Sequence, residues 1–375
     1  MDNEQNSFKK KGDARYINLH VADPYFDTPQ PIKEMMIHSL SNGFTHYSST
    51  IGLESFRKAI ASFYDKEFSV RINPSNEVIP TNGAGEGLYL ILHSLFEPGD
   101  EIIIPNPTYH GFLKKVKHSS LVAKFVPMFL ADTENFDVNS VSNAITDKTK
   151  AIYICNPNNP TGTVLRKEDM DKISILLEKN NKIMLIVDKC YSRILYEGAK
   201  YYEFLSYDKI RDQILVVDSF SKTYAMTGWR IGYIIGSESN IAKVSETAFD
   251  VRSSVNTAIQ EVAAQTISIK EPFVKEMVYQ YSKRRHLILS FLKENNIGFF
   301  EPHGGFEVFV DISRFGLTST QFSEKIQDMM HVKVVSGSEF GPNGEGYIRI
   351  VFCVAEDELK EGLLRIRQFI NTLDQ

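Results

Sequence analysis

One lysine stands out because of the residues around it. Lys222 follows a strand-like apolar run, Ile214 to Asp218, and lies among small hydroxyl residues, with Arg230 further along the chain. A lysine at the end of a buried strand is poorly placed for solvent and well placed to form a Schiff base with a carbonyl cofactor. The hydroxyls and the arginine supply the donors and positive charge that bind a phosphate. An ordinary surface lysine is the alternative.

The whole segment 219–233, S-F-S-K-T-Y-A-M-T-G-W-R-I-G-Y, resembles the lysine motif of the class I/II aminotransferases. These are fold-type-I enzymes that use pyridoxal 5′-phosphate (PLP). The resemblance implies that Lys222 forms the Schiff base with PLP and that Ser219, Ser221 and Arg230 bind the phosphate. A buried structural ion pair is the alternative role for Arg230.

A glycine-rich turn precedes the apolar-periodic run Leu88 to Phe96. Backbone N–H groups at the start of a helix, together with the helix dipole, favour an anion there. From the residues alone, a plain tight turn is the better interpretation. The resemblance places the PLP phosphate on the N–H groups of Ala84 and Gly85.

An aspartate ends another apolar run, Ile183 to Val187. Such a carboxylate is costly to bury unless it is paired. Asp188 and Tyr191 resemble the family's D-x-x-Y element, which implies that Asp188 pairs with the protonated pyridine nitrogen of PLP and that Tyr191 reaches the ring's 3-oxygen. The family often has an acidic residue after the aspartate, whereas this chain has Lys189. A helix-capping aspartate is the alternative.

Residues 156–162, N-P-N-N-P-T-G, resemble the family's N-P-x-N-P-T-G loop. This implies that Asn159 bonds the 3-oxygen of PLP and helps to hold the substrate carboxylate. The Asn159–Pro160 bond is a candidate for a cis peptide, because such bonds occur almost only before proline. Tyr109 corresponds to an aromatic ring that stacks on the pyridine in the family. The alternative for residues 156–162 is a generic turn, and the alternative for Tyr109 is a core tyrosine.

Two further segments concern a second subunit and the substrate. Residues 45–53 resemble the family's T-H-Y-x-x-x-x-G-L segment, which implies that Tyr47 reaches the PLP phosphate of the other subunit in a homodimer. Arg349 lies within an apolar strand pattern, and a buried arginine requires a bidentate anion. In the family this anion is the α-carboxylate of the amino-acid substrate. The alternative for Tyr47 is an interface or core tyrosine. The alternative for Arg349 is a fixed salt bridge.

Several departures from the family leave the substrate open. Ala22 stands where glycine is usual, Asp23 where glutamate is usual, and Ser336 replaces a usual proline. The loop that contains Ala22 lies near the substrate in relatives, so its Cβ is expected to narrow or redirect the pocket. Arg252 lies near the position of an arginine in some dicarboxylate-specific relatives, but the local match is poor and we expect it to be solvated. The amino acid and the 2-oxo acid are therefore not identified.

The elements that must position these residues follow from the pattern of the chain. In its middle part, short apolar runs alternate with polar segments of helix length, such as Arg166 to Asn180. This predicts a mostly parallel sheet flanked by helices, and in such sheets ligands bind beyond the carboxyl ends of the strands. The apolar runs are 101–105, 151–155, 183–188 and 214–218.

The C-terminal third predicts a smaller α+β domain, because strands and helices occur there without strict alternation. The expected helices are Lys275 to Asn295 and about Glu356 to Leu373, and the expected strands are 305–312, 332–335 and 346–354. In the family the N-terminal segment packs with this part. We therefore predict an α/β protein of PLP-dependent transferase fold type I, with an N-terminal arm, a small domain and a large PLP-binding domain. The predicted ranges are 1–15 for the arm, 16–45 and 290–375 for the small domain, and 46–289 for the large domain.

Composition excludes other classes of protein. The chain has 375 residues, 42% of them hydrophobic and 24% charged, and a net charge of −5, so nothing suggests nucleic acid as a partner. The polar N-terminus does not look like a secretory signal, and no apolar run approaches the roughly 18 residues of a membrane span. Cys155, Cys190 and Cys353 show no metal-ligand spacing, and we expect reduced thiols, no metal and a cytoplasmic location.

The resemblance covers about residues 16–370 and predicts a PLP-dependent aminotransferase. Such an enzyme moves an amino group between an L-amino acid and a 2-oxo acid by a ping-pong mechanism. Lys222, freed as an amine, would move the proton between Cα and C4′. The alternative is a PLP-dependent lyase, cyclase or decarboxylase with the same cofactor site. An effector-sensing domain of a transcription factor is a third class, disfavoured because only about fifteen residues precede the matched region.

Overall fold

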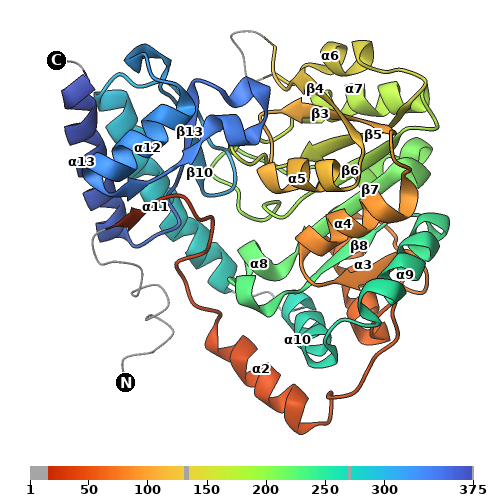
Figure 1. The fold of residues 1–375 in the computed structure, drawn as a ribbon. Coiled ribbons are helices and arrows are strands. Elements are labelled where there is room, and N and C mark those ends of the chain that lie inside the picture. Colours follow the sequence, from red (N-terminus) through yellow and green to blue (C-terminus); the bar gives the residue numbers. More distant parts are fainter. Residues whose placement is uncertain (1–15, 131–134, 269–271, 374–375) are drawn as a thin grey trace.

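The computed structural model describes residues 16–130, 135–268 and 272–373. A seven-stranded sheet with the order β2-β8-β7-β6-β5-β3-β4 forms its larger part (Figure 1). Only β8 runs antiparallel to its neighbours, and the other pairs are parallel. The strands are β2 Val78–Thr81, β3 Glu101–Asn106, β4 Val122–Pro127, β5 Thr149–Cys155, β6 Met184–Asp188, β7 Ile214–Ser219 and β8 Gly232–Ile235.

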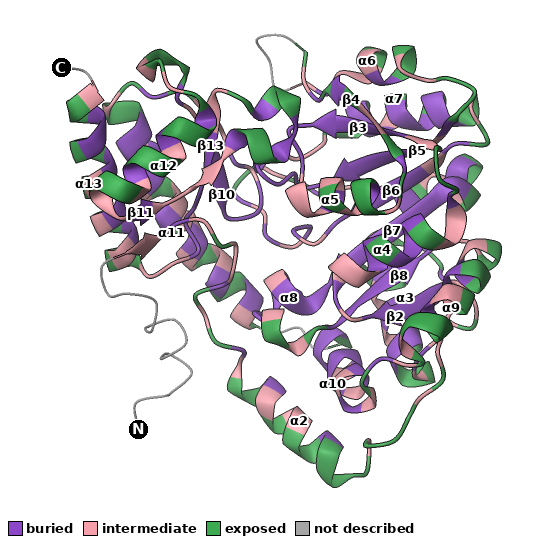
Figure 2. Ribbon diagram, viewed as in Figure 1, coloured by how far each residue is buried: buried purple, intermediate pink, exposed green. Residues whose placement is uncertain are grey.

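Helices cover both faces of this sheet, as continuous apolar strands require. Alternate residues of β7 enter different hydrophobic clusters: Val216 belongs to one, and Leu215 and Val217 to the other. Apart from the edge strand β4, the strands are accordingly largely buried, whereas the outer faces of the helices are exposed (Figure 2). The helices of this part are α3 Glu54–Phe68, α4 Ala84–Leu95, α5 His110–His118, α6 Val138–Asn143, α7 Lys167–Glu178, α8 Phe220–Thr223, α9 Glu238–Arg252 and α10 Thr257–Ser268.

A second group of elements has its own hydrophobic cluster. It contains a four-stranded antiparallel sheet with the order β12-β13-β10-β9. Its strands are β9 Phe299–Phe300, β10 Glu307–Asp311, β12 Val335–Ser336 and β13 Tyr347–Val351. Its helices are α11 Pro272–Glu294, α12 Ser319–Met330 and α13 Glu356–Leu373.

The N-terminal segment connects the two groups. Strand β1 (Ile17–Asn18) pairs in parallel with β11 (Val332–Lys333), so the start of the described chain lies beside the C-terminal helices (Figure 1). Helix α2 (Gln30–Ser41) then packs against α10. The intervening residues, which include Ala22, pass between the two groups.

Most of the elements predicted from the sequence are present, and the fold class is confirmed. The apolar runs of the middle part form β3, β5, β6 and β7, and the last helix spans Glu356–Leu373 as expected. The strand expected at 332–335 was wrong in one respect: the segment divides into β11 and β12, which pair with different partners. Nowhere in the described ranges does a helix combine the length and apolar character needed to span a membrane.

Candidate active site

A cavity of about 500 Å³ lies at the carboxyl ends of β5, β6 and β7. Elements of both groups contribute to it, because the N-terminal segment and β13 close one side. Every residue predicted above to bind cofactor or substrate lines this cavity, with the single exception of Tyr47. The lining residues are His20, Val21, Ala22, Ala84, Gly85, Tyr109, His110, Cys155, Asn159, Asp188, Cys190, Tyr191, Ser219, Ser221, Lys222, Thr227, Arg230, Val335 and Arg349.

One end of the cavity presents hydrogen-bond donors and positive charge. Helix α4 begins at Ala84 without a side-chain cap, and Ala84 and Gly85 line the cavity, so their N–H groups are available to a ligand there. Arg230 reaches the same loop, where its Nη2 donates to the carbonyl of Asn82 at 3.1 Å. Gly83 has φ 80°, and a Cβ there would lie 2.5 Å from Arg230 Nη2, so only glycine allows this approach.

Arg230 makes no salt bridge among the described residues, which argues against the structural ion pair considered as an alternative. Its Nη1 donates only to the carbonyl of Thr227, at 2.9 Å. The hydroxyl residues Ser219 and Ser221 line the same cavity. This combination of N–H groups, hydroxyls and a guanidinium without a carboxylate partner fits a phosphate group.

Asp188 is a buried carboxylate at the carboxyl end of β6, only 5% exposed. Its Oδ2 accepts a hydrogen bond from the Tyr153 hydroxyl (3.3 Å), and its Oδ1 accepts one from the Cys190 N–H (3.2 Å). Burial raises the pKa of Asp188, and these hydrogen bonds oppose the rise. No salt bridge to Asp188 occurs in the described part of the chain. A protonated ring nitrogen in the cavity would supply the missing cation.

Lys222 extends from the short helix α8 into the middle of the cavity. Its Nζ donates a hydrogen bond to the backbone carbonyl of Ala22 and lies 5.9 Å from the centre of the Phe306 ring. No carboxylate pairs with this amine among the described residues. A lysine held by one carbonyl is free to react with an aldehyde that enters the cavity.

Arg349, in β13, is 3% exposed and lines the same cavity as Lys222, from the other group of elements. Its Nη1 donates to Asn159 Oδ1 at 3.0 Å, and its Nη2 donates to the carbonyl of His20 at 2.6 Å. Its Nε has no hydrogen-bond partner. The alternative of a fixed salt bridge is not found in the described residues, so this guanidinium fits a carboxylate brought by a ligand.

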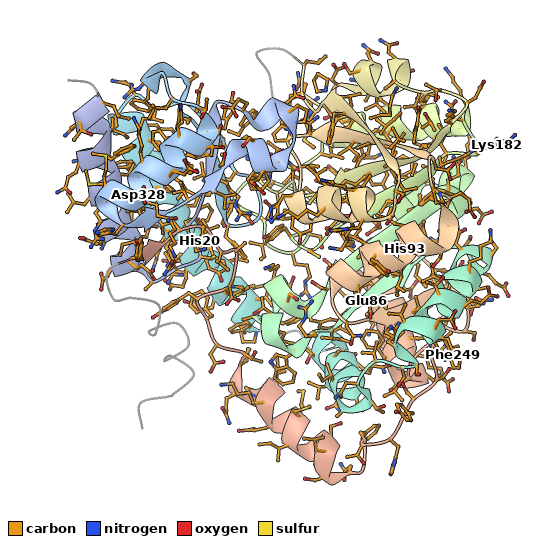
Figure 3. All side chains as sticks on the ribbon, in the orientation of Figure 1. His20, Glu86, His93, Lys182, Phe249 and Asp328 are labelled. Carbon is orange, nitrogen blue, oxygen red and sulfur yellow. The ribbon has the colours of Figure 1, made fainter. Side chains whose placement is uncertain are left out.

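The sequence did not single out several residues of the cavity wall. His110 is one of them: burial lowers its pKa to about 4, with further contributions from Arg349 and two nearby lysines, so its imidazole is neutral near pH 7. His20, labelled in Figure 3, enters beside the C-terminal elements, and its pKa is also lowered by burial. The position of His110 directly after Tyr109 was the only signal that could have identified it.

Two expectations were wrong. In the described ranges the cis peptide bonds are Asn106–Pro107 and Asn156–Pro157, not Asn159–Pro160. Any X-Pro bond can adopt the cis form, and the sequence does not distinguish among neighbouring prolines. Arg252 is not solvated: its side chain is 6% exposed, and its Nε lies 3.1 Å from Glu86 Oε2. The reason is that α9 packs against α4, which places the end of α9 beside Glu86 (Figure 3).

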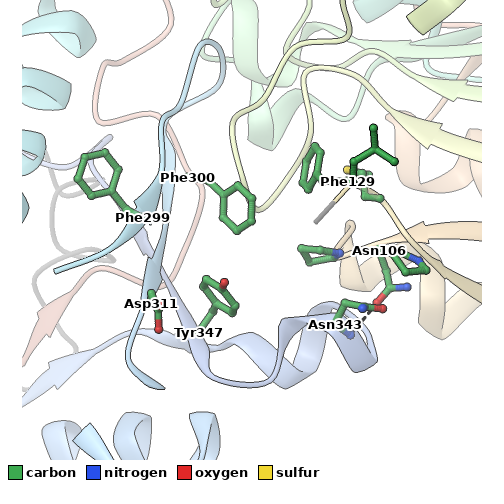
Figure 4. A pocket seen from close by; sticks show the side chains of 11 residues that line it. Asn106, Phe129, Phe299, Phe300, Asp311, Asn343 and Tyr347 are labelled. Atoms are coloured by element: carbon green, nitrogen blue, oxygen red, sulfur yellow. Dashed lines mark hydrogen bonds between the residues drawn. The ribbon is translucent and has the colours of Figure 1, made fainter. Parts of the chain in front are cut away.

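A second hollow, of about 530 Å³, has a different character (Figure 4). Its wall includes the aromatic rings of Phe129, Phe300 and Tyr347, and Asp311 is its carboxylate. As far as the chain is described, this wall contains no basic side chain. The described residues also contain no cluster of His, Cys, Asp and Glu suited to a metal ion. Unlike this hollow, the first cavity is lined by a lysine, Lys222, and an arginine, Arg349.

Comparison with known proteins identifies close similarities over nearly the whole chain. The family model for aminotransferase class I and II matches residues 14–366. An aspartate aminotransferase of Pyrococcus horikoshii is 36% identical over 94% of this chain and 90% of its own length. Aromatic-amino-acid aminotransferase 2 of Thermococcus litoralis is 32% identical over 94% and 91%. The crystal structure of the aromatic aminotransferase from Pyrococcus horikoshii superposes with a TM-score of 0.92, at 32% identity, over 99% of both chains.

Proposed function

Since the chain belongs to the class I and II aminotransferases, we propose that the cavity between its two groups of elements is the active site and that Lys222 binds the cofactor there. Enzymes of this family use PLP and move an amino group between an amino acid and a 2-oxo acid in two half-reactions. One observation supports placing the active site in this cavity. A buried carboxylate, Asp188, and a buried guanidinium, Arg349, both lack ionic partners in the described chain and line the same cavity as Lys222.

The residues of the cavity suit the three parts of the cofactor. Its phosphate would be held by the start of α4 and by Ser219, Ser221 and Arg230. Asp188 would hold a proton at the ring nitrogen, and Tyr109 would stack on the ring. Asn159 and Tyr191 would face the 3-oxygen. When bound, PLP supplies an electron sink for the electrons released at the substrate's Cα.

The substrate would be held and converted by residues on the facing wall. Arg349 would bind the α-carboxylate with Asn159 beside it, which fixes the Cα hydrogen relative to Lys222. The free amine of Lys222 would then take the proton from Cα and deliver it to C4′ of the cofactor, as general base and acid. Ala22, which lines the cavity and whose carbonyl contacts Lys222, would lie near the substrate side chain.

A product screen tests this function. The purified protein is loaded with PLP, incubated with single amino acids, and the products are identified by mass spectrometry. We expect a 2-oxo acid with the intact carbon skeleton of one amino acid, together with aminated cofactor. Loss of carbon dioxide, or of a substituent at Cβ or Cγ, would instead assign the site to a decarboxylase or lyase.

We further propose that the active enzyme is a homodimer in which Tyr47 serves the partner's site. Tyr47 is 89% exposed and does not line the cavity of its own chain, so a large aromatic side chain is left at the surface. Two defective variants, Tyr47→Ala and Lys222→Ala, should then complement each other. A mixed dimer has one site with both defects and one site with neither, because the dimer axis exchanges the contributed residues.

The measurement is activity after subunit exchange between the two variants. Partial recovery, up to about half of the wild-type activity for each mixed dimer, is expected from the symmetry. Lys114→Ala, which alters an exposed lysine (side chain 65% exposed), replaces Lys222→Ala in a control mixture that should retain higher activity. The test requires Tyr47→Ala to be severely impaired alone. No recovery despite proven exchange would place Tyr47 outside the partner's site.

A further inference from the structure

Glu307, the first residue of β10, is a carboxylate buried behind the cavity wall. It is 0% exposed and forms no salt bridge among the described residues. Its Oε2 accepts the backbone N–H of Phe306 at 3.0 Å, and its Oε1 accepts the hydroxyl of Tyr191. A fully buried glutamate without a cation is rare and carries a cost in stability. Its direct link to the cavity is the Tyr191 hydroxyl.

Tyr191 has only one proton to donate. A phenol has a single O–H donor, so the proton given to Glu307 is not available to an acceptor in the cavity. Burial, and then the charge of Glu307, raise the pKa of Tyr191 far above its ordinary value, so the tyrosine stays protonated. The titratable and charged groups around the pair are Cys155, Tyr196, Lys222, Arg285, Arg349 and Cys353.

We propose that Glu307 is a positioning residue that competes with the cofactor's 3-oxygen for the Tyr191 proton. When Tyr191 donates to Glu307, the 3-oxygen loses a hydrogen-bond donor and holds more tightly the proton that it shares with the Lys222 nitrogen. When Tyr191 turns to the 3-oxygen, that proton is released more easily. This inference rests on the proposed function, in which Tyr191 faces the 3-oxygen.

The substitution Glu307→Gln should reverse the direction of the hydrogen bond between Tyr191 and residue 307, because glutamine has nearly the same side-chain volume as glutamate but can donate. The N–H of Phe306 requires an acceptor, so the amide oxygen takes the place of Oε2. The amide NH₂ group then faces Tyr191 and donates to its oxygen. The Tyr191 proton is thereby directed toward the cavity.

The test is the pH titration of the visible absorption of the cofactor bound to the holoenzyme. Glu307→Gln should lower the apparent pKa of this absorption change by about half a unit to one unit, the size of one hydrogen bond. Tyr196→Phe is the matched control. Tyr196 is also buried and donates to the carbonyl of Gly305 beside Glu307, but it does not line the cavity, so its loss should leave the titration unchanged.

The variant Tyr191→Phe separates the effect of the Tyr191–Glu307 hydrogen bond from the effect of the negative charge of Glu307. In Tyr191→Phe the shift caused by Glu307→Gln should fall to less than half, because the competing proton is gone. An equal shift in both backgrounds, or no shift in the first, would overturn the inference. If Glu307→Gln does not fold, Glu307→Asp keeps the charge, withdraws the carboxylate from Tyr191 and should shift the titration in the same direction. A wild-type protein without any absorption from bound cofactor would instead overturn the proposed function itself.

Discussion

Replacement of Lys222 by alanine is expected to abolish nearly all transamination. The change removes the amine that we propose binds the cofactor and moves the Cα proton, and general acid–base catalysis alone contributes about 10²–10⁴-fold. We therefore expect kcat to fall by at least about 10³-fold. The measurement is the single-turnover rate of a PLP-loaded variant with an amino acid that the product screen has identified.

Two comparisons make this expectation specific. Lys114→Ala removes an exposed lysine outside the cavity and should keep nearly the wild-type rate. A small primary amine added to Lys222→Ala should restore part of the rate, because it can occupy the vacated space and accept the proton. A Lys222→Ala variant with more than about a tenth of wild-type kcat would be incompatible with the role of a general base, given the usual size of that effect.

Replacement of Asp188 by asparagine is expected to slow proton transfer far more than it weakens cofactor binding. An amide cannot hold the ring nitrogen protonated, whereas the phosphate contacts at the start of α4 are untouched. We expect the single-turnover rate to fall by about 10²–10³-fold, the usual size of a lost electrostatic contact in an active site. The dissociation constant of PLP should change by about tenfold or less, which corresponds to one hydrogen bond. Stopped-flow absorption and equilibrium titration measure the two quantities.

Asp218 offers the matched control for Asp188. It lies near the end of the neighbouring strand β7, is 8% exposed and does not line the cavity. Burial raises the pKa of Asp218 to about 6. Asparagine keeps the shape of this side chain and removes its charge. Asp218→Asn should change the single-turnover rate far less than Asp188→Asn does. Equal losses in the two variants would mean that Asp188 acts only through the packing of the sheet.

The sequence predicted the position of the cavity because parallel strands bring their carboxyl ends together. Asp188 and Ser219 each end a continuous apolar run, and that pattern alone indicated one shared edge. Arg349 was identifiable for a different reason, since a single arginine in an apolar strand needs an anion. These inferences depend on local pattern and on the polarity of each side chain.

Other features depend on packing between distant segments, and the sequence did not reveal them. Tyr191 and Glu307 are separated by 116 positions and meet only because β10 packs behind the cavity. Arg252 was expected in solvent, since nothing in its neighbourhood along the chain indicates that α9 lies against Glu86. Lys189 departs from the family pattern, and its partner Glu203 lies 14 positions further along the chain. Both side chains are 1% exposed in a buried salt bridge.

Covalent trapping of the cofactor tests the central claim most directly. The PLP-loaded protein is treated with borohydride, which reduces the bond between a lysine and the cofactor to a stable one, and the modified peptide is identified by mass spectrometry. The account predicts a single adduct, on Lys222, which is absent from Lys222→Ala and unchanged in Lys114→Ala. An adduct on a different lysine, or none after loading with PLP, would contradict it.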